Sequence, residues 1–79
     1  MKAKSQIIIA ENYGIIDHEN GVIRASVMSI DLMSMLRDRE IGKTPEGEAS
    51  TSDLFNAWYK GWDKARQEEM RKKFPEMYK

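Results

Sequence analysis

Residues 53–66 read DLFNAWYKGWDKAR, and they determine the longest element that the sequence predicts. Large apolar side chains recur here every three or four residues, which is the period of one face of a helix. The face consists of Leu54, Phe55, Trp58, Tyr59, Trp62 and Ala65. A domain this small needs most of its large apolar side chains inside. We therefore expect this face, and Trp58 and Trp62 above all, to form the core.

The boundaries of this helix follow from the residues around it. Thr51 or Ser52 can cap its start, because a hydroxyl accepts a hydrogen bond from a free backbone N–H in the first turn. Pro75 disfavours helical geometry at the residue before it, so the helix should end near Lys73. The predicted helix is roughly 20 residues long and about 30 Å in length.

Small residues form a groove along the same helix. Ala57, Gly61 and Ala65 follow one another at intervals of four. Gly61 costs about 1 kcal/mol of helix stability relative to alanine, and the close approach of another backbone would offset this cost. The neighbour would be either the other predicted helix, at about residues 30–40, or the same helix of a second subunit, so a homodimer is one prediction.

The N-terminal part of the chain has the features of a small sheet. Residues 7–10 are a β-branched run typical of a buried strand. Asn20-Gly21 is a strong hairpin signal, because both residues tolerate positive φ. Residues 22–28 alternate in polarity, so Ile23 and Val27, with Ala25, should face the core while Arg24 and Ser26 face solvent. In this register Asp17 would pair with Arg24 across the strands, and Ile16 would lie opposite Ala25.

After residue 28 the apolar period becomes helical. Ser29 can cap a helix from about residue 30 to residue 40, and Gly42 can end it. Residues 43–52 contain no large apolar side chain, which predicts an exposed loop. The predicted fold is α+β: an N-terminal antiparallel sheet of two or three strands, followed by two helices of which the second is long. Residues 1–79 should form a single domain.

Composition argues against several classes of function. The chain has no cysteine and a single histidine, His18, so we expect no metal site and no cofactor. Asp17 and Glu19 flank His18, but consecutive residues of a strand point to opposite faces. Gly42-Lys43-Thr44 lacks the earlier glycine of a phosphate-binding loop. We therefore predict that the protein is not an enzyme.

No apolar run approaches the length of a membrane span or a secretory core, so we expect a cytoplasmic location.

The spacing Phe55-x-x-Trp58-x-x-x-Trp62-x-x-Ala65-Arg66 resembles a tryptophan-rich segment of small accessory proteins of tailed phages and prophages. The resemblance covers only this segment of the chain. It implies an accessory protein acting in the host cytoplasm, in a class that includes inhibitors of host defence systems such as anti-CRISPR-like proteins. Some such inhibitors are acidic and mimic DNA, whereas this chain has 13 basic and 13 acidic residues and no net charge.

These observations favour a small, non-catalytic protein-binding module, which would inhibit a host defence complex. The partner-binding residues that we predict are Tyr59, Lys60, Lys64 and Arg71, on an exposed side of the long helix. Tyrosine is a frequent binding hot spot. The alternative is a nucleic-acid-binding or transcription-regulatory protein, for example a ribbon-helix-helix dimer, that uses the basic end of the same helix: residues 60–79 carry seven basic and four acidic side chains.

Overall fold

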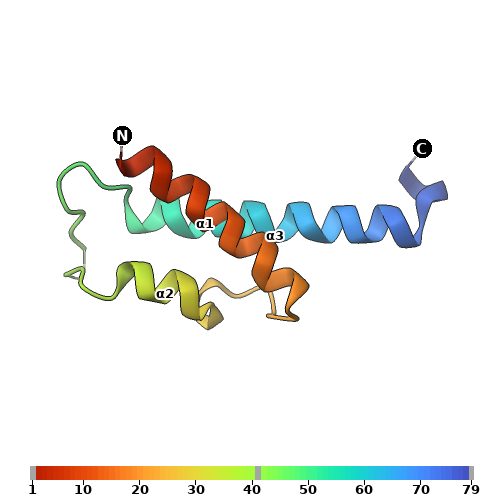
Figure 1. The fold of residues 1–79 in the computed structure, drawn as a ribbon, viewed down its shortest axis with the longest axis horizontal. Coiled ribbons are helices and arrows are strands. Elements are labelled where there is room, and N and C mark those ends of the chain that lie inside the picture. Colours follow the sequence, from red (N-terminus) through yellow and green to blue (C-terminus); the bar gives the residue numbers. More distant parts are fainter. Residues whose placement is uncertain (1, 41, 79) are drawn as a thin grey trace.

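A computed structural model describes residues 2–40 and 42–78 of the chain, and the described part is all helical. Figure 1 shows the three helices. They are α1 (Lys2–Glu19), α2 (Ile30–Leu36) and α3 (Thr51–Lys73), with short 3₁₀ turns η1 (Ser26–Met28) and η2 (Pro75–Tyr78). No strand occurs in residues 2–40 or 42–78. The predicted α+β fold is therefore wrong, and so is the ribbon-helix-helix alternative, which requires a strand.

Two glycines allow α1 and α3 to cross with their backbones in contact. A Cβ atom added to Gly61 would lie 1.9 Å from the carbonyl oxygen of Glu11, and one added to Gly14 would lie 2.1 Å from that of Trp58. No side chain fits at either position. The groove predicted at Gly61 is real, but α1 of the same chain fills it, so that surface is not open to a second subunit.

The core lies where the three helices meet. Both tryptophans of α3 are buried there, as the apolar face predicted. The buried apolar residues are Ala10, Leu32, Ala49, Leu54, Ala57, Trp58 and Trp62. The molecule measures 46 × 23 × 16 Å, and its length comes from α3, whose C-terminal half extends beyond the other helices (Figure 1).

The predicted strand at residues 7–10 lies inside α1. The isoleucines of α1 surround the helix: Ile7 packs against the core, whereas Ile8, Ile9 and Ile16 are exposed. A helix with apolar residues on several sides has no helical period in its sequence, and β-branched residues favour strands when nothing else decides. Contact with α3 through the two glycines overrides this local preference.

Asn20-Gly21 ends α1 instead of turning a hairpin. Gly21 has a φ of +81°, its N–H donates to the carbonyl of His18 (3.1 Å), and the N–H of Val22 donates to the carbonyl of Asp17 (2.9 Å). This pair of bonds is a Schellman cap. Asn20-Gly21 correctly predicted a residue with positive φ, but positive φ is typical of a helix C-terminus as well as of a hairpin turn.

The start of α2 and the end of α3 follow the predictions, and two other boundaries shift. The Ser29 hydroxyl accepts from the N–H of Leu32 (3.2 Å), which confirms the predicted cap. However, α2 ends at Leu36 and not near residue 40. The cap of α3 is Ser50, one residue before the predicted candidates, while the helix ends at Lys73 as predicted.

The loop before α3 is more firmly held than its composition predicted. Ala49 is buried, and its N–H donates to the side-chain oxygen of Gln6 in α1 (2.8 Å). The amide nitrogen of Gln6 donates to Glu48 (2.8 Å). One α1 side chain therefore anchors the C-terminal end of this loop.

Candidate docking surface

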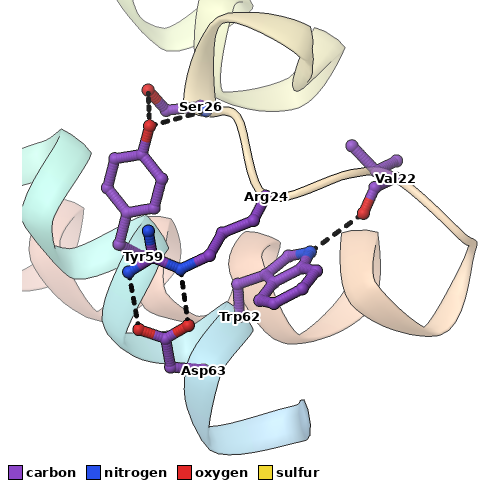
Figure 2. A network of polar contacts seen from close by, with 6 residues as sticks. All are labelled: Val22, Arg24, Ser26, Tyr59, Trp62 and Asp63. Atoms are coloured by element: carbon purple, nitrogen blue, oxygen red, sulfur yellow. Dashed lines mark hydrogen bonds and ion pairs between the residues drawn. The ribbon is translucent and has the colours of Figure 1, made fainter.

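The segment that joins α1 to α2, residues 20–29, is here called the connector. It crosses beside α3 and turns its polar side chains toward that helix (Figure 2). Arg24 donates from Nε and Nη2 to the two carboxylate oxygens of Asp63, at 2.7 and 2.8 Å. Its guanidinium also lies 4.7 Å from the centre of the Tyr59 ring. Two parallel bonds of this kind fix the orientation of an arginine as well as its position.

Two further contacts hold the connector on α3. The Tyr59 hydroxyl accepts from the backbone N–H and the hydroxyl of Ser26, at 3.2 and 3.3 Å. The indole N–H of Trp62 donates to the carbonyl of Val22 at 2.9 Å. Figure 2 shows the connector held at Val22, Arg24 and Ser26 by Trp62, Asp63 and Tyr59 of α3.

The same contacts shift the pKa values of their members. The hydrogen bond with Arg24 lowers the pKa of Asp63 below its ordinary value, and it raises the pKa of Arg24. Hydrogen bonds from Ser26 lower the pKa of Tyr59. The side chains of Arg24 and Asp63 are 49% and 44% exposed, so solvent screens this ion pair and its contribution to stability is modest.

The apolar side of the connector faces solvent. Ile23 is 64% exposed, Val27 67%, Met28 59% and, at the start of α2, Ile30 82%. These four residues are here called the connector patch. The prediction placed Ile23 and Val27 in the core, and the structure exposes both. Of the two residues predicted to face solvent, Ser26 is buried, whereas Arg24 stays about half exposed while it pairs with Asp63. The reason is that Asp63 and Tyr59 of α3 supply polar partners for the polar side, which no pattern within residues 22–28 reveals.

A hollow of about 350 Å³ adjoins the connector patch on the outer side of α2. Its lining is mainly apolar, with one cation at the rim: Val27, Met28, Ser29, Ile30, Met33, Ser34 and Arg37. The Arg37 side chain has no hydrogen bond or ion pair with any residue of the described part of the chain. Methionine side chains line adaptable binding surfaces in other proteins because they are flexible and polarizable.

A buried carboxylate underneath fixes the position of this surface. Asp17, at the end of α1, accepts from the indole N–H of Trp58 (2.8 Å) and from the Ser29 hydroxyl. Ser29 in turn caps α2. The Asp17–Arg24 pair predicted across two strands does not form: Asp17 points inward to Trp58, and Arg24 pairs with Asp63.

The four predicted partner-binding residues have different environments. Tyr59 is half-buried and holds the connector, so its hydroxyl is already bonded to Ser26. Lys60, Lys64 and Arg71 are exposed and lie along one row of α3 at intervals of four and seven residues. The structure thus places the three cations together and assigns Tyr59 to internal packing.

Acidic neighbours balance the basic end of α3. Arg71 pairs with Glu68 (3.3 Å) and Lys73 with Glu69 (2.8 Å). A groove of about 550 Å³ between the end of α1 and α3 carries both signs of charge, with Lys64 and Lys72 beside the same two glutamates. Glu68 and Glu69 therefore reduce the net positive charge that the C-terminal part of α3 offers to phosphates.

The one histidine lies beside this groove. His18 Nε2 is 3.4 Å from a carboxylate oxygen of Glu69, and the imidazole packs edge-on against Trp62 with ring centres 4.8 Å apart. Within residues 2–40 and 42–78, no three histidine, cysteine or acidic side chains gather in a way that could hold a metal ion.

No family model, curated protein or solved structure matches this chain. Among the described residues, no helix combines the length and the apolar character needed to cross a membrane.

Proposed function

We propose that the chain is a small, non-catalytic protein-binding module whose docking surface is the connector patch. Its role would be that of a phage or prophage accessory protein that inhibits a host defence complex, as the resemblance of the tryptophan-rich segment implies. The observation that carries the proposal is the arrangement of the connector: Arg24 and Ser26 bond to α3, whereas Ile23, Val27 and Met28 are exposed.

Energetic considerations support this assignment. Exposed apolar surface is unfavourable by roughly 25 cal/mol per Å² relative to burial, and scattered exposure of single residues is ordinary. Here, however, Ile23, Val27, Met28 and Ile30 are all exposed within eight residues of chain. Bonds to Tyr59, Trp62 and Asp63 hold the backbone beneath them, so a partner would bind a preformed surface and little ordering entropy would be lost.

The nucleic-acid alternative has less support. It would use the basic row Lys60, Lys64 and Arg71, and Arg71 already pairs with Glu68. Binding to phosphates requires a net positive surface. The same three cations could instead contact a protein partner, as the sequence predicted, and the experiment below separates these uses.

The test is capture of partners from bacterial lysate, followed by affinity measurement with each purified partner. The patch variants are Val27→Glu and Ile30→Glu, which place a charge on the docking surface without touching the core. The matched control is Ile8→Glu, at another exposed isoleucine on α1. A triple variant, Lys60→Glu with Lys64→Glu and Arg71→Glu, tests the basic row.

We expect the patch variants to weaken binding by about thirtyfold or more, because a hot spot contributes about 2 kcal/mol or more and each 1.4 kcal/mol is tenfold in affinity. The Ile8→Glu and wild-type proteins should bind alike. If only the triple variant loses the partner, the basic row is the interface and the connector patch is not. Affinity for DNA that falls steeply as salt rises would favour the nucleic-acid alternative.

A further inference from the structure

We propose that the connector patch and the outer face of α2 bind a second copy of this chain, with the two α2 helices antiparallel across a two-fold axis at Ser34. The inference rests on the proposed function, because it uses the same docking surface, for which a second copy and a host partner would compete. It differs from the homodimer predicted from the groove at Gly61, which α1 fills.

The outer face of α2 has a sequence that complements itself. Asp31, Ser34 and Arg37 follow at intervals of three and are all exposed, and Arg37 keeps helical backbone angles (φ −54°, ψ −39°). A two-fold axis through Ser34 places residue 31 of each copy opposite residue 37 of the other. Each aspartate then faces an arginine, twice per dimer, as an interface between identical surfaces requires.

Both charges lack partners within the chain. Neither the Asp31 nor the Arg37 side chain forms an ion pair or hydrogen bond with any residue that the structure describes. In contrast, Arg24, Arg39, Lys43, Arg71 and Lys73 all have an acidic neighbour. Among the described residues, α2 and its C-cap thus carry one unpaired acid and one unpaired base, Asp31 and Arg37. Each lies three residues from Ser34, which is the spacing that pairs them across a two-fold axis.

The centre and the flanks of the face also suit a second helix. Ser34 is small and exposed, so two helices can approach closely there. Ile30 and Met33 lie beside it and line the hollow that a second α2 would cover. A standard interface buries about 800 Å² per partner, against 5903 Å² of accessible surface here. Chains of this length often gain stability by oligomerising.

Charge exchange tests the proposal directly. Asp31→Arg and Arg37→Asp each place like charges opposite each other, so each variant alone should self-associate about tenfold more weakly than the wild type. An equimolar mixture of the two variants restores opposite charges at both contacts, and we expect it to form a heterodimer. Sedimentation velocity at high micromolar concentration measures all three samples, and circular dichroism confirms that each variant is folded.

Ser34→Arg provides a second test that does not depend on charge pairing, because a long side chain at the axis blocks the approach of the helices. A wild-type monomer at high micromolar concentration would overturn the proposal. So would a wild-type dimer that the variants leave intact, or a mixture that stays monomeric. If the chain is monomeric while Ile30→Glu still abolishes capture of another protein, only the second copy is excluded and the proposed function stands. If neither self-association nor capture depends on the patch, both fail.

Discussion

At the scale of single residues, Asp17 connects the three helices. One carboxylate oxygen at the end of α1 accepts from the indole of Trp58 in α3 and from the hydroxyl of Ser29, which caps α2. The carboxylate is buried, so water cannot replace these partners. The position of α2, and with it the docking surface, therefore depends on this side chain.

We predict that Asp17→Ala lowers the free energy of unfolding by about 3 kcal/mol, because each buried donor left without an acceptor costs about 1–3 kcal/mol. Asp17→Asn keeps one carbonyl oxygen and the shape of the side chain, so its loss should be smaller. Urea denaturation followed by tryptophan fluorescence measures both variants. Equal midpoints for Asp17→Ala and the wild type would show that the bonds do not stabilise the fold.

Gly61→Ala should destabilise the protein, contrary to the usual effect in a helix. Alanine is ordinarily better than glycine by about 1 kcal/mol in a helix. Here the added methyl would meet the Glu11 carbonyl at 1.9 Å, so α1 and α3 must separate. We expect a loss of about 2 kcal/mol or more, as for other overpacked sites. Lys60→Ala, exposed on the same helix, is the control. A Gly61→Ala protein as stable as the wild type would contradict the close crossing.

At the scale of elements, α3 holds the connector in place through side-chain hydrogen bonds. Trp62, Tyr59 and Asp63 bind it at successive points (Figure 2). Because the Arg24–Asp63 ion pair is about half exposed, breaking it should change the global free energy of unfolding little. Local opening of the connector should become more frequent.

The ion pair makes the connector sensitive to acid. The pKa of Asp63 in the folded protein lies below its unfolded value of about 3.9, because Arg24 donates to it. The stabilisation is therefore fully present above that unfolded value, and it is lost as pH falls through the lower folded value. We predict that backbone protection of residues 22–28, from NMR at a series of pH values, is constant near pH 5 and declines only in strong acid.

Asp63→Asn removes this titration. The variant should show weaker protection at pH 5, since the charge-assisted bonds are lost, and a flatter dependence on acid. Equal acid dependence in the variant and the wild type would mean that another group, such as Glu48, whose pKa is also lowered, controls the behaviour.

At the scale of the whole molecule, stability is concentrated at one end. The buried residues of α3 run from Leu54 to Trp62, and the same helix then continues beyond α1 and α2. Past Ala65, the face that would meet the core carries Glu68, Glu69 and Lys72. The projecting part is polar and is supported by ion pairs within the helix, as a solvated helix requires.

Deleting residues 74–79 should therefore change the free energy of unfolding by less than about 0.5 kcal/mol, as for other surface changes. Deleting residues 2–6 should be clearly destabilising, because it removes Gln6, which holds the loop before α3 through Ala49. Thermal unfolding by circular dichroism compares the two truncated chains. A large loss from the C-terminal deletion would show that residues 74–79 contribute to the fold.

Part of this architecture could be predicted from the sequence. The amphipathic period of residues 54–65, the Ser29 cap and Pro75 depend on neighbours a few residues away, so they determined α3, its buried tryptophans and the start of α2 without tertiary information. The row Lys60, Lys64 and Arg71 follows from the same period. The prediction that these cations bind a partner remains open.

The rest depended on partners distant in the chain. Residues 7–10 became helix because Gly14 and Gly61 let two backbones touch, and Asn20-Gly21 had a positive-φ signal that a helix cap and a hairpin share. Residues 22–28 alternate as a strand would, but Asp63 and Tyr59 bind the polar side, so the apolar side was left outward. Alternation determines which residues share a face, whereas only the tertiary structure decides which face is buried.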